Sequence, residues 1–335
     1  MVLFTVIISL IVFAVLIVIH EFGHFVVAKV TGVKVIEFSV GMGPLLLSKD
    51  YKDTQYSLRL LPIGGYCQMY GEEGQNKGEG SFSEKSPVAR LMVILAGPLM
   101  NLLLSWILFI IIGTSIGVPT TTIDNIMNNY PAAKSGMKSG DEIIYINDKK
   151  INDWTEMSQI ISQTDSEMNL SVRRDGRLIH LAIKPIYDKE TKRNIIGIEP
   201  VLSRNLFVSS KWGILQVYDV SKAIITALGT LLLKGFNLNG FTGPVGTMNI
   251  IGKVAKTGVI NLMNLSAIIS INLGVFNLIP IPALDGSRIF FILIEMLRGR
   301  PIEPERENTI HFIGLILLLA FSALITYKDI INLSR

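Results

Sequence analysis

The sequence is poor in cysteine: Cys67 is the single cysteine among 335 residues. One thiol cannot form a disulfide within the chain, and it cannot build a metal site from several thiolates. A disulfide-stapled fold and a cysteine cage are therefore excluded. Any metal site in this chain would have to be built from other side chains, such as histidine and carboxylates.

Charged residues are also scarce. They make up 17% of the chain, against 49% hydrophobic residues, whereas soluble domains carry about 25% charged residues. This composition is typical of a membrane protein. The net charge of +4 does not indicate a nucleic-acid partner, because the basic residues gather in particular loops and no arginine-rich stripe alternates with aromatic residues.

The N-terminus lacks the basic leader and the small-residue cleavage site of a signal peptide, so we expect its apolar run to be retained. Four segments are apolar enough to cross a bilayer, which takes about 20 residues. They are Val2 to Val27, Leu91 to Val118, Leu262 to Leu284 and Thr309 to Tyr327. Several asparagines and serines in the third favour contact with other helices or an aqueous cavity over contact with lipid.

The first apolar run ends in His20-Glu21-Phe22-Gly23-His24. Two histidines four positions apart share one face of a helix and can bind one metal ion, with Glu21 beside them as a base. No charged residue precedes them, and ionisable groups at membrane depth are costly and mark function by default. The plainer alternative is a helix that ends in a polar cap at the membrane surface. The pentapeptide favours a zinc enzyme that works within the bilayer.

Basic residues predict the orientation in the membrane. The segment from Lys29 to Arg90 is rich in lysine and arginine, and the connection between the last two spans carries Arg298, Arg300 and Arg306. The positive-inside rule places both in the cytoplasm and both termini outside. The stretch from about Thr120 to Pro200 then lies outside as a folded domain.

The predicted fold is a membrane α-helical protein with about four transmembrane helices, a β-rich loop and an inserted α+β domain. Residues 1–118 form an N-terminal membrane part, 119–202 the outer domain, and 203–335 a C-terminal membrane part. In the outer domain, strands are predicted at 142–147, 169–173 and 178–184, and a helix at 154–163. The helix at 211–236 carries charges, which favours the membrane surface over a fifth span.

The first loop contains a β-prone stretch, Gln55 to Tyr70, within a β-rich segment at about 50–75. Gly64-Gly65 is a turn or bulge signal in it, and its apolar residues are many for a solvated loop. Such a strand can line a protein-walled cavity and offer its edge to an extended substrate. A small cytoplasmic hairpin is the alternative.

A catalytic zinc usually has three protein ligands and a water, so the two histidines leave one ligand to be found. Asp285 is the best placed candidate, since it follows the third span on the side to which the first span delivers His20 and His24. Two prolines just before it break the helix and can turn the carboxylate inward. An ordinary Asp-Gly turn is a comparable interpretation of this segment alone. Glu295 and His311 flank the last connection and are less well placed.

Together these motifs resemble the site-2 protease family of intramembrane zinc metalloproteases, and closely its bacterial regulator-of-sigma-E protease group. The resemblance covers nearly the whole chain. It rests on the His-Glu-x-x-His motif, on Ala96-Gly97-Pro98-Leu99-Met100-Asn101, and on Asn277 to Gly286 with its Asn-x-x-Pro-x-Pro-x-Leu-Asp-Gly pattern. Pro62 to Tyr66 and Gly243-Pro244-Val245 also match.

The resemblance implies specific roles. His20, His24 and Asp285 would be zinc ligands, and Glu21 the catalytic acid and base. Asn277 would lie near the substrate, although an interhelical hydrogen bond is a nearly equal alternative for it. The first loop would form a membrane-reentrant β-sheet that contacts substrate at Gly64, Gly65 and Tyr66.

The resemblance also implies a PDZ domain between the second and third spans, and Pro131 to Ile151 looks like its characteristic segment. Well-studied relatives in Gram-negative bacteria have two PDZ domains, whereas this chain has room for one. A size filter built from a tandem pair is therefore not implied here. The PDZ groove would take a peptide ligand.

The implied activity is regulated intramembrane proteolysis in the bacterial cell membrane, with the active site near the cytoplasmic side. Expected substrates are single-span membrane proteins such as anti-sigma factors and remnant signal peptides. The alternative function is a membrane metal transporter or a metal-binding scaffold, since polar residues in spans also mark ion pathways. Glu21 argues against this alternative, because transport gives no reason for a general base between the histidines.

Overall fold

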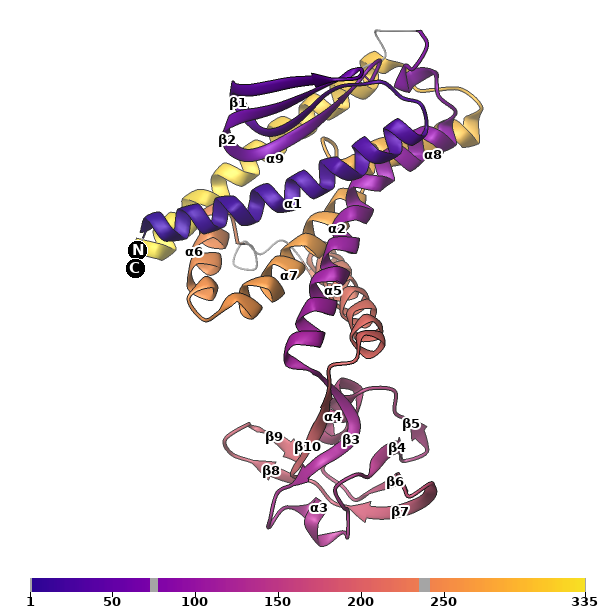
Figure 1. Ribbon diagram of the computed structural model, residues 1–335, viewed down its shortest axis with the longest axis vertical. Coiled ribbons are helices and arrows are strands. Elements are labelled where there is room, and N and C mark those ends of the chain that lie inside the picture. Colours follow the sequence, from indigo (N-terminus) through magenta and orange to yellow (C-terminus); the bar gives the residue numbers. More distant parts are fainter. Residues whose placement is uncertain (1, 73–77, 235–241, 335) are drawn as a thin grey trace. The chain divides into compact units, whose positions relative to one another are not determined.

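The computed structural model describes residues 2–72, 78–234 and 242–334 (Figure 1). The chain forms two compact units, one made of Met1–Phe109 with Gly213–Arg335 and the other of Ile110–Trp212. Each unit is described by itself below.

Long apolar helices occupy the four predicted spans. They are α1 (Val2–Val30), α2 (Pro87–Ile116), α7 (Val259–Leu278) and α9 (Pro304–Ser334). The third is shorter than predicted: α7 ends at Leu278 because Pro280 and Pro282 cannot continue a helix. A separate helix, α8 (Asp285–Arg298), begins after them, and the shorter α6 (Pro244–Ala255) precedes α7.

The described residues hold a further helix of this kind, α5 (Leu206–Lys234), where a surface helix was predicted. Five helices are thus long and apolar enough to cross a membrane, the fifth over Leu206–Leu231. Many apolar side chains on these helices are exposed, among them Phe312 and Leu317 on α9. Large apolar groups on the outside of a helix suit contact with lipid tails, which need no hydrogen bonds.

The first loop forms a β-hairpin, β1 (Val35–Tyr51) and β2 (Thr54–Met69), followed by the short helix η1 (Phe82–Glu84). It is larger than the predicted segment at about 50–75, because the strand β1 was not foreseen. Figure 1 shows the hairpin alongside α1. Its inner face packs on α1, α2 and α8 in one core that includes Phe38, Met69, Ala28, Val93 and Ile292.

Both strands of the hairpin bend back on themselves. Phe38 of β1 pairs with Tyr56 on one side and with Cys67 on the other, so residues 35–40 lie between two parts of β2. Gly41 and Gly64 have positive φ values of 87° and 96°, which glycine adopts without strain. In the described part of the chain, the segment Gly65–Met69 pairs only with β1. It is therefore an edge strand.

The second unit has an α+β fold. Its main sheet has six strands in the order β10-β3-β4-β6-β7, with β5 paired to β4. The elements are β3 (Val118–Ile126), α3 (Pro131–Lys134), β4 (Glu142–Ile146), β5 (Lys149–Lys150), α4 (Trp154–Gln163), β6 (Met168–Arg174), β7 (Arg177–Ile183), β8 (Ile186–Asp188), β9 (Arg193–Ile195) and β10 (Ile198–Ser203). The three predicted strands correspond to β4, β6 and β7, and the predicted helix to α4. The strands β3 and β10 were not predicted.

Local chemistry explains where α4 begins. The Asp153 side chain accepts a hydrogen bond from the Glu156 N–H at 2.8 Å, which caps the helix. The inward face of α4 then buries Met157 and Ile161 against the sheet residues Ile143, Leu170 and Val172. This unit therefore has a hydrophobic core of its own.

Candidate metal centre

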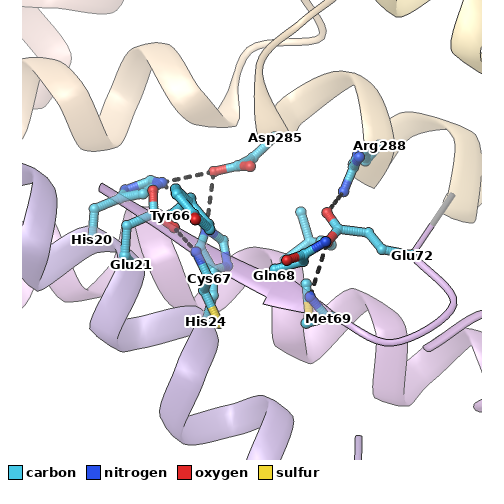
Figure 2. Close-up of a pocket in the computed structure, with 11 residues that line it drawn as sticks. His20, Glu21, His24, Tyr66, Cys67, Gln68, Met69, Glu72, Asp285 and Arg288 are labelled. Atoms are coloured by element: carbon cyan, nitrogen blue, oxygen red, sulfur yellow. Dashed lines mark hydrogen bonds and ion pairs between the residues drawn. The ribbon is translucent and has the colours of Figure 1, made fainter. Parts of the chain in front are cut away.

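Three potential metal ligands converge where α1 meets the start of α8 (Figure 2). His20 and His24 lie one turn apart on α1, and Asp285 is the first residue of α8. Asp285 Oδ2 is 3.0 Å from His20 Nε2 and 3.5 Å from His24 Nε2. The two Nε2 atoms are 3.2 Å apart. The structure thus brings together two side chains of the first predicted span and a third that lies 265 positions after His20.

These separations fit a zinc ion. Ligand atoms at about 2.0 to 2.1 Å in a tetrahedral arrangement lie about 3.3 to 3.4 Å from one another. The three observed separations fall on either side of this value. Two imidazoles and one carboxylate also form a donor set that zinc uses in catalytic sites, which keep the fourth position open.

Two glycines allow the helices around the site to approach closely. A Cβ atom at Gly97 of α2 would lie 2.3 Å from His24 Nε2 and 2.9 Å from His20 Nε2. A Cβ atom at Gly23 of α1 would lie 2.3 Å from the Ala96 carbonyl oxygen. All three separations are below the 3.0 Å that real Cβ atoms keep from their neighbours, so glycine is required at both positions.

The other ring nitrogens are held by α2. His24 Nδ1 lies 2.9 Å from the Val93 carbonyl oxygen, which can only accept, so Nδ1 carries the proton and Nε2 keeps its lone pair for a metal. His20 Nδ1 lies 3.2 Å from the Asn101 side-chain amide, whose Oδ1 is buried without a partner. If the amide is rotated by 180°, Oδ1 accepts a hydrogen bond from His20 Nδ1–H. The lone pair of His20 Nε2 is then available to bind the metal, as that of His24 is.

Asn101 was not singled out from the sequence beyond its place in a matching motif. It is fully buried, and its backbone carbonyl accepts hydrogen bonds from Ser105 and Ser270 at 2.8 Å each. A lone amide inside an apolar span was the available signal, because a buried polar side chain needs a partner.

Glu21 points from α1 toward the hairpin (Figure 2). Its Oε2 accepts a hydrogen bond from the Cys67 N–H at 3.1 Å. Glu21 and the three potential ligands line a cavity of about 500 Å³ together with Tyr66, Cys67, Gln68, Met69, Glu72, Ile94 and Arg288. Burial, together with the nearby Glu21 and Glu72 carboxylates, raises the pKa of the Cys67 thiol, so this cysteine stays protonated and is unsuited to be a nucleophile.

The remaining predicted site residues lie at different distances from the centre. Asn277 lines a second cavity of about 250 Å³, which His20, Glu21 and Asp285 also line. Tyr66 lines the larger cavity, and a Cβ at Gly65 would be 3.7 Å from the Glu21 side chain. A Cβ at Gly64 would instead meet Met42. Gly64 therefore allows the bend of the hairpin and does not line the cavity.

Comparison with known proteins identifies relatives along the whole chain. The model for peptidase family M50 matches residues 8–321. A relative from Clostridium acetobutylicum is 38% identical over 98% of both chains. The regulator of sigma-W protease RasP of Bacillus subtilis is 30% identical over 97% of this chain and 98% of its own length. The zinc metalloprotease RasP of Geobacillus kaustophilus is 31% identical over 96% of both chains.

Among solved structures, the PDZ domain of an SdrC-like protein from Listeria monocytogenes aligns with 25% of this chain and 87% of its own length. The sequence identity is 22% and the TM-score is 0.22.

The contact between Asn101 and His20 generates a prediction. Asn101→Leu removes the amide beside His20 Nδ1, and we expect zinc affinity to fall by about 10- to 100-fold, as for other residues that orient metal-binding histidines. Competition with a chromophoric chelator measures this. Asn101→Asp keeps an acceptor and should retain most of the affinity, whereas Asp285→Ala should lose more than either. Wild-type affinity in Asn101→Leu would show that the amide does not orient His20.

Proposed function

The chain belongs to peptidase family M50, the family of the site-2 proteases, and from this we propose that it cleaves the membrane-spanning segments of single-span membrane proteins. It is a zinc metalloendopeptidase, and the family indicated by its motifs is thereby confirmed. The observation that carries the intramembrane proposal is the position of the site. Its two histidines and Glu21 lie on α1 after a largely apolar run without a charged residue, so a substrate must reach them at membrane depth.

We assign His20, His24 and Asp285 as the residues that hold the zinc ion. The ion supplies an electrophile that makes water acidic and polarises the scissile carbonyl. The Glu21 carboxylate takes the proton from the attacking water and passes it to the leaving amide nitrogen. Its position one residue after His20, in the same cavity, suits this role.

The edge strand Gly65–Met69 is the proposed substrate platform. The Cys67 N–H donates to Glu21, and the Met69 N–H donates to Glu72 Oε2 at 3.3 Å. Both donors therefore point away from β1 into the cavity, where they bind side chains that an incoming strand can displace. Glu72 is also paired with Arg288 of α8. An unwound substrate segment that adds to this edge would bind through its main chain, which leaves side-chain selectivity loose.

Asn277 is proposed to orient the bound substrate. It lies on the side of Glu21 and Asp285 that faces the second cavity, so its amide can bond to a substrate carbonyl or to the oxyanion that forms from it.

We propose anti-sigma factors and remnant signal peptides as substrates, since two relatives of nearly equal length are named RasP and one of them is named a regulator of sigma-W protease. Residues 119–202 are proposed as a single extracytoplasmic PDZ domain that takes a peptide ligand. Residues 1–118 and 203–335 then form the two membrane parts of the enzyme. Because Asp285 follows α7 and lies beside His20, α7 and α1 cross the membrane in the same direction. No observation favours the metal transporter.

The first test of this function is Glu21→Gln. The amide cannot accept the water proton, so we expect cleavage of a single-span substrate to fall by at least about 100-fold, the lower end of general-base effects. Zinc content should stay at the wild-type level, because Glu21 is not one of the three ligands. Phe22→Leu, at the next position of α1, serves as the matched control. Cleavage at the wild-type rate in Glu21→Gln would contradict the assignment of the base.

The second test concerns the edge strand. Cys67→Pro removes one outward N–H, which an edge strand tolerates structurally, whereas Cys67→Ala keeps it. We expect at least a tenfold lower cleavage rate in the proline variant than in the alanine variant, with equal zinc content. Helix-breaking residues placed in the substrate should restore part of the rate, because less unwinding is then needed. Equal rates for the two variants would reject strand addition.

The third test concerns sidedness. In a Cys67→Ser background, a cysteine at the exposed Ser166 should react with an impermeant thiol reagent in intact cells. A cysteine at the exposed Ser86 should react only after lysis, because the basic first loop is proposed to be cytoplasmic. The reverse pattern would overturn the orientation.

A further inference from the structure

The turn that delivers Asp285 holds an unusual backbone conformation. Residues 281–284 form a turn closed by the Leu284 N–H and the Ile281 carbonyl at 3.1 Å. Pro282 is its second residue, and Ala283, its third, has a φ of +74°. This is the pattern of a type II turn, in which the third residue is normally glycine or asparagine because a Cβ atom disfavours positive φ. Ala283 is therefore held in a conformation that it would not adopt freely.

The helix α9 holds this turn at two adjacent residues. The Ala283 N–H, which does not take part in the bond that closes the turn, donates to His311 Nδ1 at 3.2 Å. One turn further along α9, Gly314 packs against Pro282, and a Cβ atom there would lie 2.2 Å from Pro282 Cβ. Because α9 has no side chain at that position, it can approach closely enough for His311 to reach Ala283.

His311 is itself fixed in its position. Its ring lies edge-on to Phe291 of α8, with the centroids 5.9 Å apart. Since Nδ1 accepts a hydrogen bond from the Ala283 N–H, the neutral ring carries its own proton on Nε2. Nε2 is buried and has no hydrogen-bond partner in the described part of the chain, and Glu307 Oε1 is 3.8 Å away. Within the described residues, the His311 imidazole therefore makes its hydrogen bond with the backbone N–H of Ala283.

The turn and the ligand are directly connected. Leu284 precedes Asp285, and its carbonyl accepts bonds from both the N–H and the hydroxyl of Ser287, which fixes the start of α8. A change of φ at Ala283 would consequently shift the Asp285 carboxylate relative to His20 and His24. Zinc sites tolerate shifts of only about 0.2 Å in ligand distance.

We propose that His311 is a positioning residue for the zinc site: it stabilises the positive φ of Ala283 and so places Asp285 for metal binding. It belongs neither to the three ligands nor to the residues that line the two cavities at the site. The proposal rests on the role of Asp285 as a ligand in the proposed function. In this proposal, α9 supports the metal site by binding the backbone of Ala283, and not by binding the metal.

The experiment measures zinc affinity by chelator competition in the full-length protein, with substrate cleavage as a second readout. His311→Ala should bind zinc about 10-fold more weakly or worse, in the range found for residues that support metal ligands. His311→Gln offers a carbonyl oxygen to the Ala283 N–H and should recover part of the loss. Thr309→Ala, an exposed position on the same helix, is the matched control and should bind zinc normally.

A second pair of variants acts on the turn itself. Ala283→Gly relieves the backbone strain, so in the His311→Ala background it should restore zinc affinity toward the wild-type value. Ala283→Val should lower zinc affinity with His311 intact, because a β-branched residue resists positive φ. This variant tests the proposal even if His311→Ala cannot be purified as a folded protein.

Different outcomes distinguish a failure of the positioning role from a failure of the proposed function. Wild-type zinc affinity in His311→Ala, or a loss that neither His311→Gln nor Ala283→Gly reverses, would overturn the positioning role while leaving the protease assignment intact. Full zinc binding in Asp285→Ala would show instead that Asp285 is not a ligand, and the positioning role would be rejected with it.

Discussion

The architecture of the catalytic unit depends on how closely α1 and α2 approach each other. Gly23 faces the Ala96 carbonyl and Gly97 faces both histidine rings, so neither position has room for even a methyl group. This close packing brings the Val93 carbonyl and the Asn101 amide to the Nδ1 atoms of His24 and His20. In lipid, where the hydrophobic effect does not drive helices together, small residues at the interface and interhelical hydrogen bonds take over that task. The same contact therefore holds the helices together and orients His20 and His24, the proposed metal ligands.

The second half of the site is assembled on this pair of helices from distant parts of the chain. The hairpin packs on α1, α2 and α8 through one core, which places its edge strand beside Glu21. On the other side, α8 begins at Asp285, and the turn before it contacts α9 at His311 and Gly314. The proposed ligand Asp285, the proposed base Glu21 and the strand edge thus converge although they belong to three separate segments. Glu21 lies on a helix, and the edge strand and the turn before Asp285 pack against helices, which preorganises the site.

Several polar groups inside the apolar helices of this unit are paired with backbone groups. Ser105 and Ser270 donate to the Asn101 backbone carbonyl, and Ser9 of α1 donates to the Met248 carbonyl of α6. Near the end of α9, Asp329 accepts the Gly246 N–H at 2.8 Å and so caps the start of α6. Buried polar groups without such partners would be costly. The bonds from Ser270 to Asn101, from Ser9 to Met248 and from Gly246 to Asp329 connect helices that apolar contacts alone would leave free to slide.

The sequence by itself determined the chemistry of this protein. The features that indicate this chemistry are local. They are the apolar runs of spanning length, the spacing of His20 and His24 with Glu21 between them, and the prolines before Asp285. Helix geometry and side-chain chemistry within each segment are enough to interpret them. The strands and the helix of the second unit that follow simple alternation or helical periodicity were predictable for the same reason. The strand β1 was not, because its pairing with two parts of β2 is a long-range contact that local patterns do not encode.

Only the tertiary structure decided how distant residues meet. The features that complete the site depend on segments far apart in the chain. They are the position of the Asn101 amide, whose Oδ1 has no partner among the described residues, the lack of space for a side chain at Gly97, the outward N–H groups of Cys67 and Met69, and the hydrogen bond from Ala283 to His311. No periodicity encodes such contacts, since they result from the packing of whole helices against one another. The chain's residue types therefore specify which reaction is possible, and the packing of its helices specifies which atoms carry it out.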